Sequence, residues 1–568
     1  MKPEPRNTNH VPRPFTQPAP QLANQFTDDR VLRSYLARTL SPGVLQQIEP
    51  QLTEMGDLAG GPLYGFQLDD RLNLPLHTPF DAWGNRIDRV DVSPLWRAAE
   101  QLAARHGLIA IPYERANGAW SRVHQFALVY LFTPSTDVYN CPLAMTDGAA
   151  CALSISGNKA LTQRALPRLT ARDPAQFWTS GQWMTESTGG SDVGLTETIA
   201  RQQHDGSWRL YGRKWFTSAV TSQMALTLAR PEGNPAGAKG LALFYLETRG
   251  ADGQLDHILL HRLKDKLGTR KVPTAELTLD GTRAIPVQGL SDGVKHIAPM
   301  LNITRTWNGV SAVGYMRRGI ALARDYARRR LAFGTPLAEK PLHLDTLAGM
   351  QAEFEAAFHL TFFLVELIGR DEAGELSPSE RDLLRLLTPI VKLTTAKQCV
   401  AVVSEALEGF GGAGYVEDTG LPMLLRDSQV FPIWEGTTNV LSLDALRALS
   451  SGAALDAFGK LLRELAQPVT EVRLLASARN AQEACANAAR WLNGAAAQGN
   501  DAVEAGARRL ALTLGRSLSL ALLARHAQWA LDVERDERCM GAALRFGRHG
   551  VDLTAGEDIG MSRSLALD

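Results

Sequence analysis

A β-rich stretch between two long helical regions is the feature that most limits how this chain can fold. From Trp178 onward, short segments such as TSGQWMTE, WRLYGRKWFTS and GLALFYLE alternate apolar and polar residues, and Asp205-Gly206 and Asp280-Gly281 are typical hairpin turns. About a hundred residues of this texture make a domain of ordinary size. The sequence therefore predicts an α+β, multi-domain protein with a central β domain.

Apolar residues recur at spacings of three and four on both sides of this stretch, which predicts amphipathic helices. Before it, and interrupted by a Pro/Gly-rich loop, we expect helices over 32–55, 94–106 and 122–131. After it, we expect a helix that begins near residue 297 and further helices over 353–368, 379–410 and 438–449. The predicted domains are a Pro-rich tail at 1–27, a helical domain at 28–178, the β domain at 179–295, a helical bundle at 296–450 and an appended helical domain at 451–568.

The charge balance argues against nucleic acid or an anionic membrane as a partner. The 568 residues hold 60 Lys plus Arg and 60 Asp plus Glu, and the last 118 residues hold 14 of each sign. Five scattered cysteines predict neither a metal site nor a disulfide framework, and fit a reducing cytoplasm. We find no signal-peptide pattern and no apolar run of membrane-spanning length, so we expect a cytoplasmic protein.

The segment FPIWEGTTN at 431–439 places one acid, Glu435, where a loop enters a helix. Two interpretations are open. Thr437 or Thr438 caps the helix and Glu435 is a solvated first-turn acid, or the loop holds the carboxylate for a chemical task. The pattern alone favours the first interpretation.

Two segments of the β region could hold a flat or phosphorylated ligand. MTESTGGSDV at 184–193 offers glycines, hydroxyls and free backbone N–H groups, which suit ring edges or phosphates, although a polar hairpin loop explains the pattern equally well. In KWFTS at 214–218, Trp215 could stack on a flat cofactor while Thr217 bonds its edge. A core tryptophan is the more common reason for this pattern.

Two further segments lie in the helical bundle. YARRRLAFG at 326–334 puts Arg330 and Phe333 on one face if the helix extends that far, where they could grip a phosphate and cover an adenine; a basic helix C-terminus is the alternative. GFGGAG at 409–414 satisfies GxGxxG, but a helix precedes it and a loop follows. A dinucleotide fingerprint needs a strand before it, so we interpret these glycines as a helix C-terminus.

Together, MTESTGGSD, KWFTS, RLKDKLGTR, YARRRLAFG, GFGGAGY and IWEGTTN resemble the motifs of the acyl-CoA dehydrogenase family, in the family's order, over residues 28–450. The chain is most similar to the AidB-like branch, because Trp434 replaces a usual Tyr and because CPLAMT, RLKDKLG and an extra C-terminal domain are present. The resemblance implies an N-terminal helical domain, a central antiparallel β domain, a C-terminal four-helix bundle and an extra C-terminal helical domain.

The resemblance also implies the cofactor, the partners and the site. FAD is the implied cofactor, acyl-CoA or a related acyl thioester the substrate, electron-transfer flavoprotein a candidate acceptor and a homotetramer (a dimer of dimers) the assembly. No metal is implied. Glu435 matches the catalytic base. The implied cofactor-binding residues are Met184, Thr185, Gly190, Ser191, Trp215, Thr217, Arg330, Phe333, Gly411, Gly412, Trp434, Thr437 and Asn439, of which Arg330 and Phe333 would reach a neighbouring subunit's FAD.

The implied reaction removes a proton α to a thioester carbonyl while the β hydride passes to flavin N5, which gives an α,β-unsaturated acyl thioester. The chain departs from the family at Glu408 and Pro341, where Gln is usual, and in a reduced glycine loop at 289–293. Two alternatives therefore stay open. One is an AidB-like, DNA-binding flavoprotein of the alkylation response with little dehydrogenase activity, and the other is a fatty-acyl-binding flavoprotein.

Overall fold

The N-terminal segment lies along the longest helix of the protein. The computed structural model describes residues 17–555 and 559–568, so residues 1–16 of the predicted tail lie outside the described part. The amide of Gln21 donates to Asp325 (2.8 Å), and Arg329 donates to the carbonyl of Ala19 (3.1 Å). Both partners belong to helix α9 (Gly293–Arg329), so residues 17–27 cover the C-terminal end of that helix.

Helices form most of the first part of the chain, as the periodicity predicts: α1 (Arg30–Thr39), α2 (Pro42–Gly60), α3 (Pro62–Asp69), α4 (Pro94–Arg105), α5 (Ala110–Glu114), α6 (Ser121–Phe132), α7 (Asn140–Ile155) and α8 (Lys159–Leu169). The single helix expected over 32–55 is two helices. Ser41 caps the second one and Pro42 opens it, a position where proline is favoured because the missing N–H would have no partner within the helix.

The loop expected between these helices contains a hairpin. Strand β1 (Leu76–Phe80) pairs antiparallel with β2 (Arg86–Asp91), and Asp81 holds the turn by accepting from the amides of Trp83 (2.8 Å) and Asn85 (2.9 Å). The expectation of a plain loop was wrong because these strands are half-exposed and alternate weakly.

The β domain consists of β3 (Ser180–Trp183), β4 (Ile199–Gln202), β5 (Trp208–Thr217), β6 (Met224–Pro231), β7 (Ala242–Glu247), β8 (Ile258–Leu263) and β9 (Ala275–Pro286). The strand order is β3-β6-β4-β5-β9-β7, β8 pairs with β9, and a β6–β7 pairing closes the order into a ring. Most pairs are antiparallel, as predicted, but β6 runs parallel to both β3 and β4. The expectation of a wholly antiparallel sheet needs this correction, because alternation reveals strands but not their direction.

A four-helix bundle follows the β domain. It consists of α9, α10 (Pro341–Glu372), α11 (Pro378–Glu408) and α13 (Thr438–Leu449), with the short α12 (Leu421–Ser428) before α13 and the small hairpin β10 (Leu331–Ala332) and β11 (Thr335–Pro336) after α9. Helix α11 is apolar and long enough to cross a membrane, but 83% of its apolar window is buried inside the protein. It is the central helix of a core.

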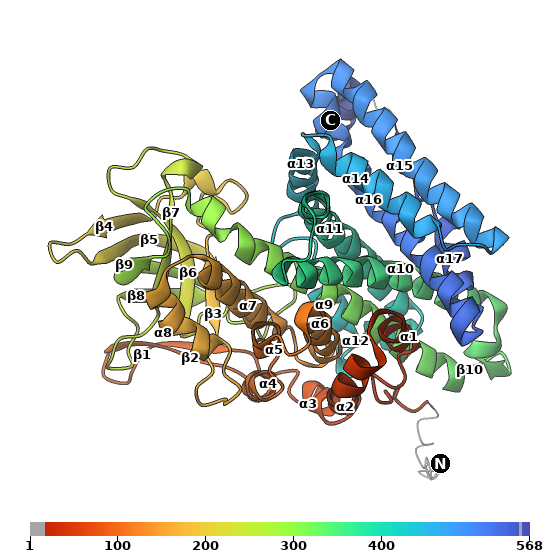
Figure 1. Cartoon of the computed structure of the whole chain (residues 1–568). Helices are drawn as coiled ribbons and strands as arrows, with labels where there is room; N and C mark the ends of the chain where they lie inside the picture. The colour runs from red at the N-terminus through yellow and green to blue at the C-terminus, as the bar shows by residue number, and fades with distance from the viewer. Residues whose placement is uncertain (1–16, 556–558) are drawn as a thin grey trace, which may run out of the picture.

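The C-terminal helices pack on this bundle or on one another, except the last one, whose described side chains are exposed. They are α14 (Ala453–Ala466), α15 (Val472–Gln498), α16 (Asn500–Trp529), α17 (Arg538–Arg548) and α18 (Ile559–Leu567), and Figure 1 shows them in blue alongside the green helices. Gly515 of α16 lies so close to α11 that a Cβ there would clash with Thr394 Oγ1. Buried side chains of α10, α11 and α16 belong to one apolar cluster, so the extra domain shares its core with the bundle.

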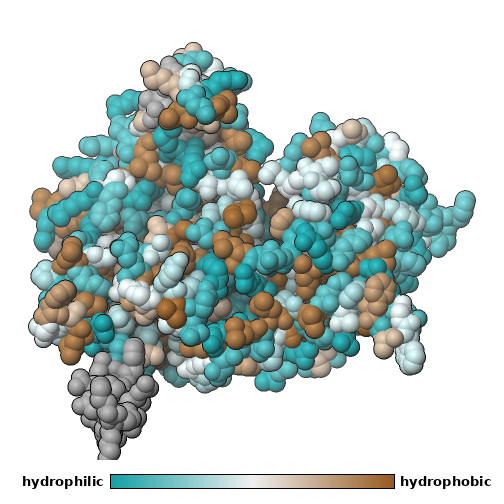
Figure 2. All heavy atoms as spheres, turned by 180° about the vertical axis from the view of Figure 1, so that it is seen from behind, coloured by the Kyte–Doolittle hydropathy of each residue, from teal (hydrophilic) through white to brown (hydrophobic). Residues whose placement is uncertain are grey.

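The two lobes of the molecule remain distinct in outline. Viewed from behind, the space-filling picture shows a notch between the lobe of the β domain and the lobe of the C-terminal helices (Figure 2). On this face, apolar residues occur in small groups among hydrophilic ones, as on the surface of most folded proteins (Figure 2).

Candidate active site

The backbone of the Glu435 loop is fixed in an unusual conformation. Glu435 has φ +57 and Gly436 has φ +104, two consecutive residues in the left-handed half of the map. A glutamate there is uncommon and costs about 1 kcal/mol or more. At Gly436 a Cβ would also meet Leu441 Cδ2 at 2.9 Å, so glycine is required. The turn aims the Glu435 side chain in one direction.

Side chains from two bundle helices hold this loop. On α9, Thr304 Oγ1 donates to Glu435 Oε2 (2.6 Å), and Arg305 Nε donates to the Glu435 carbonyl oxygen (3.3 Å). On α11, Lys392 Nζ donates to the carbonyl oxygen of Gly436 (2.7 Å). Trp434 Nε1 donates to Asn308, also on α9. Glu435 therefore precedes the helix cap and is bonded to α9, which differs from a solvated acid in the first turn.

A charged group anchors the helix that follows the loop. Asp444 of α13 accepts from Arg305 (2.8 Å) and from Arg385 (2.5 Å). Burial alone would raise the pKa of Asp444, but the hydrogen bond from Arg385 and the charge of Arg305 outweigh burial and lower it. Arg305 thus links α9 both to the Glu435 backbone and to α13.

Lys392 is a buried cation beside the candidate base. Its side chain has no exposed surface, and burial lowers the pKa of its ammonium to about 7. The negative charge of Glu435 acts in the opposite direction and favours the protonated form, whereas Arg305 opposes it. Lys392 and Glu435 therefore influence each other electrostatically.

Cys141 marks the place where the Glu435 loop meets the β domain. The thiol, on α7, is buried, which raises its pKa to about 12. Lys266, Glu435 and a hydrogen bond with Ser218 also act on this thiol. Lys266 donates to the carbonyl of Val272 (2.8 Å), and burial lowers the pKa of its ammonium to about 8. The charge of the candidate base thus acts on a thiol that also bonds Ser218, the residue after strand β5.

A buried ion pair shapes the loop at 184–193. Glu186 accepts from Lys214 Nζ (2.7 Å), from Thr198 Oγ1 (2.5 Å) and from the amide of Glu197 (2.7 Å). Both charged side chains are buried, so breaking the pair would leave an uncompensated charge in the interior. Lys214 and Glu186 thus have a structural role inside the two motifs that the sequence offered as candidate cofactor-binding segments.

The predicted flavin residues of the β domain lie side by side. The amide of Trp215 donates to the carbonyl of Thr185 (2.9 Å), which joins KWFTS to the 184–193 loop. At Gly190 a Cβ would meet Thr185 Oγ1 at 2.7 Å, so the loop can fold back only with glycine there. Met184 and Thr185 are half-buried, whereas Gly190 and Ser191 are exposed.

Trp215 is half-exposed and Thr217 is buried. Lys264 Nζ lies 3.9 Å and Arg213 Cζ 5.1 Å from the centre of the indole ring. Thr217 Oγ1 donates to the carbonyl of Ala275 (2.8 Å), which ties the end of β5 to β9. The Trp215 ring is therefore not a core side chain, in contrast to the alternative weighed from the sequence.

Arg330 and Phe333 do not share a helix face. Helix α9 ends at Arg329, and Arg330 is already extended. The chain then forms the β10–β11 hairpin, whose turn is Phe333-Gly334 with φ +50 and +86. Phe333 at the tip is 98% exposed. The expectation of one helical face was wrong because the Phe-Gly turn stops the helix before Arg330.

The glycine segment lies next to this hairpin. Gly411–Tyr415 forms a short 3₁₀ helix directly after α11, so no strand precedes it, as predicted. A small apolar cluster joins the region to α9: the rings of Phe410 and Tyr326 are 4.7 Å apart. Gly411 and Gly412 are exposed, and a Cβ on either would meet no atom within 4 Å.

The remaining predicted residues lie at the start of α13. Thr437 is the N-cap, and its side chain accepts from the amide of Val440 (3.4 Å), which confirms the capping role weighed from the sequence. Asn439 is exposed in the first turn. Sequence reasoning missed Thr304, Arg305, Asn308 and Lys392, which lie in ordinary helical patterns without a local signal. Within residues 17–555 and 559–568, no group of His, Cys, Asp and Glu side chains is placed to hold a metal ion.

Four family models match successive parts of the chain. They are the adaptive response protein AidB N-terminal domain over 16–174, the acyl-CoA dehydrogenase middle domain over 181–282, the acyl-CoA dehydrogenase C-terminal domain over 291–450, and the acyl-CoA dehydrogenase 11 C-terminal domain-like model over 453–558. The matches follow the same order as the helical, β, bundle and C-terminal parts of the structure.

Relatives that match most of the chain belong to the same family as these models. Acyl-CoA dehydrogenase family member 11 of Caenorhabditis elegans is 44% identical, over 90% of this chain and 86% of that protein. AidB of Escherichia coli is 32% identical, over 68% of this chain and 71% of that protein. The crystal structure of C. elegans ACDH-11 in complex with C11-CoA matches with a TM-score of 0.93 and 40% identity, over 98% of this chain and 97% of that one. This chain therefore belongs to the acyl-CoA dehydrogenase family, with an AidB-type N-terminal domain and an ACDH-11-type C-terminal domain.

Proposed function

We propose that the protein is an FAD-dependent oxidoreductase that converts an acyl-CoA, or a related acyl thioester, into its α,β-unsaturated form. The observation that carries this proposal is the Glu435 carboxylate, which Thr304 holds at 2.6 Å in a loop with two positive φ angles. The charge of Glu435 also acts on the buried Cys141 thiol, as do Lys266 and a hydrogen bond with Ser218, near the junction of the bundle and the β domain. A carboxylate held still at such a junction suits proton abstraction.

In this reaction Glu435 removes the proton from the carbon next to the thioester carbonyl. The loop loses little freedom during the step, because Thr304, Arg305 and Lys392 already fix it from two helices. Lys392 also supplies a positive charge beside the carboxylate when it is protonated. FAD, when bound, supplies the acceptor for the hydride that leaves the β carbon.

The residues present fit a flat cofactor that carries phosphates. The indole of Trp215 is half-exposed, and the neighbouring residues 187–191 are exposed, with Gly189 alone among them paired through its backbone to Glu186. Gly411 and Gly412 leave open space where any side chain would stand, which permits close backbone approach. Phe333 is 98% exposed at a hairpin tip, so its ring buries almost no apolar surface against its own chain.

The exposed residues also support an assembly. We place Arg330 and Phe333 against the FAD of a neighbouring subunit, in a homotetramer built as a dimer of dimers. Electron-transfer flavoprotein is the proposed electron acceptor. The five cysteines are free thiols, which supports a location in the cytoplasm.

A flavin-bleaching screen tests the reaction. The purified, FAD-loaded protein is mixed anaerobically with saturated acyl-CoAs of graded chain length, and the flavin absorbance is followed by stopped flow. We expect bleaching with at least one chain length and none with free coenzyme A. If every acyl-CoA leaves the flavin oxidised, the proposed reaction is wrong.

A second candidate is an acyl-CoA-binding flavoprotein without turnover, because the similar ACDH-11 structure is described as a complex with C11-CoA. Calorimetric titration with the same acyl-CoAs separates the two: tight binding without bleaching supports this second function. Strong binding of duplex DNA is not favoured, since residues 451–568 carry 14 basic and 14 acidic side chains.

A further inference from the structure

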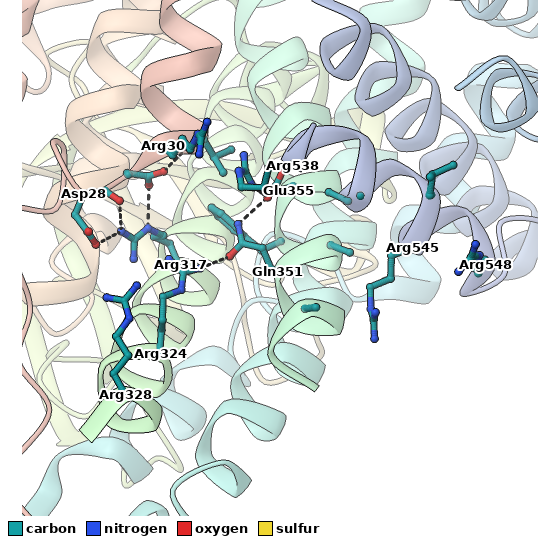
Figure 3. A pocket seen from close by; sticks show the side chains of 18 residues that line it. Asp28, Arg30, Arg317, Arg324, Arg328, Gln351, Glu355, Arg538, Arg545 and Arg548 are labelled. Atoms are coloured by element: carbon teal, nitrogen blue, oxygen red, sulfur yellow. Dashed lines mark hydrogen bonds and ion pairs between the residues drawn. The ribbon is translucent and has the colours of Figure 1, made fainter. Parts of the chain in front are cut away.

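A pocket of about 540 Å³ lies where the C-terminal helices meet the bundle, away from Glu435 (Figure 3). Its walls come from α9, α10, α17 and the start of α1. On α9, Thr304 beside Glu435 and Arg317 in the pocket are separated by about 20 Å of helix at the usual rise per residue. None of the predicted cofactor-binding residues lines it.

Small residues leave room for the pocket, and arginine side chains surround its opening. Ala348, Ala352, Gly541 and Ala542 occupy positions where larger side chains would close the gap between α10 and α17. Arg317, Arg324 and Arg328 recur at spacings of seven and four on one face of α9, and Arg538, Arg545 and Arg548 line up along α17 (Figure 3). We call this space the arginine pocket, which also includes Arg30.

The charges of the arginine pocket do not balance. Seven arginines line it, against the three carboxylates Asp28, Asp29 and Glu355. Arg317 pairs with Asp28 (3.0 Å) and Asp29 (3.1 Å), and Arg538 pairs with Glu355. Arg30 and Arg545 pair with acids at the rim, Asp536 (2.7 Å) and Asp345 (2.5 Å).

The other three arginines of the pocket form no ion pair with a carboxylate of the described residues. Arg324 donates only to the neutral Gln351 (2.8 Å), and Arg328 and Arg548 form no ion pair with any residue of the described ranges 17–555 and 559–568. Burial lowers the pKa of Arg324 and the charges of Arg317 and Arg328 lower it further, while the carboxylates of Asp28 and Asp29 act in the opposite direction. Positive groups that crowd each other in this way are stabilised when an anion enters.

Arg317 supplies an unused donor. Its side chain is only 6% exposed, and its Nε and Nη2 are bonded to Asp29 and Asp28. Its Nη1 is buried without a hydrogen-bond partner among the described residues. An unpaired buried guanidinium N–H costs about 1–3 kcal/mol, and because this atom is buried, a ligand accepts the bond and gains affinity when the Arg317 side chain shifts toward the pocket.

We propose that the arginine pocket binds the phosphoryl group of a small phosphorylated molecule. A phosphoryl group offers several oxygens and more than one negative charge, and it matches the planar fork of arginine. The pocket volume of about 540 Å³ is within the range of small-molecule sites.

Binding of inorganic pyrophosphate and of AMP to the FAD-loaded protein tests the proposal. Titration calorimetry and thermal unfolding are recorded at constant ionic strength, with sodium chloride as the reference anion. We expect saturable binding of at least one probe and a raised Tm that chloride does not produce. Tighter binding of AMP than of pyrophosphate identifies a nucleotide as the source of the phosphoryl group, and the reverse identifies a free phosphate.

Two variants locate the site. Arg328→Gln combined with Arg548→Gln removes two unpaired charges and should weaken binding at least tenfold. Gly541→Leu keeps every charge but fills the pocket, and a Cβ at Gly541 meets no atom within 4 Å, so the fold accepts it. It should weaken binding similarly. Arg508→Gln, an exposed arginine of α16 outside the pocket, is the matched control and should bind as wild type does.

Three results would overturn the proposal. The first is no saturable binding of either probe to the wild-type protein. The second is unchanged binding in both pocket variants while flavin absorbance shows them folded. The third is a short DNA duplex that binds more tightly than AMP and loses this binding in the double arginine variant, which would assign the pocket to nucleic acid.

Discussion

The Glu435 loop and the Arg330–Gly334 hairpin are supported in opposite ways. Both carry residues at positive φ: Glu435 and Gly436 in the first, Phe333 and Gly334 in the second. The loop is held by side chains of α9 and α11 and lies within the fold. The hairpin has only two residue pairs of its own, and Phe333 at its tip is 98% exposed.

One chain alone builds the surroundings of Glu435, whereas it leaves the Phe333 side chain at the tip of the Arg330–Gly334 hairpin almost fully exposed. The base is positioned entirely by its own chain, so its geometry should survive in an isolated subunit. The backbone of the hairpin is preorganised, but the Phe333 ring at its tip buries almost no surface against the rest of the chain. This arrangement suits a segment that binds a ligand or a second subunit. Four substitutions test whether the loop and the hairpin differ in this way.

The largest effect is expected at the base itself. Glu435→Gln keeps the size of the side chain and can still accept from Thr304, but it removes the basicity. The rate of flavin reduction by a verified acyl-CoA substrate should fall about a hundredfold or more, with FAD still bound. Glu375→Gln, a change at an exposed glutamate, is the control. An unchanged rate in Glu435→Gln would mean that another group is the base.

The hairpin should affect the cofactor and not the chemistry. Arg330→Ala should weaken FAD retention by about tenfold or more, because a charge-assisted contact to a phosphate is worth more than a neutral one. Gel filtration followed by flavin absorbance measures the retained FAD. Arg479→Ala removes an exposed arginine elsewhere and should retain FAD fully. If Arg330→Ala holds FAD as wild type does, the hairpin does not reach the cofactor.

Removal of the Thr304 hydroxyl tests whether its hydrogen bond positions the Glu435 carboxylate. Thr304→Val removes the 2.6 Å hydrogen bond to Glu435 while it keeps the side-chain shape. A hydrogen bond to a charged group contributes about 1.5–3 kcal/mol, so the reduction rate should fall roughly tenfold. Thr304→Ser, which keeps the hydroxyl, should restore most of that rate. If valine and serine behave alike, the bond does not position the base.

The smallest effect concerns pH and Lys392. Its pKa is about 7 in the folded protein and 10.5 for an ordinary solvated lysine, so between these values the unfolded chain binds more protons and stability rises with pH. Lys392→Met removes this contribution. From pH 7.5 to 9, urea unfolding should show a gain smaller in the variant than in wild type, by on the order of 1 kcal/mol. Lys295→Met, at an exposed lysine, should keep the wild-type gain.

Local signals predicted much of the fold. Thr437 followed by an apolar pattern located α13 from Thr438 to Leu449, and the helix expected over 94–106 corresponds to α4. Alternation located the strands of the β domain. Strand direction was not predicted, because the parallel pairing of β6 with β3 and β4 depends on how the chain crosses over between strands.

The site was predicted less completely than the fold. Glu435 was singled out because Gly436 and the capping threonine frame it in the sequence. Its partners Thr304 and Lys392 are separated from the loop by 131 and 44 residues, and only the packing of three helices brings them together. The Arg330–Phe333 geometry was missed because a spacing rule assumes that the helix continues.

The close contact of α16 with α11, where Gly515 meets Thr394, has a consequence for how the protein is made. Helices α10 and α11 leave the ribosome long before α16, yet α16 covers part of their apolar surface. Until α16 is synthesised, that surface faces water and is open to aggregation or to chaperones. We expect chains truncated after Ser450 to be recovered mainly in inclusion bodies. Because the C-terminal helices are synthesised last, their docking on the bundle is the step that completes folding.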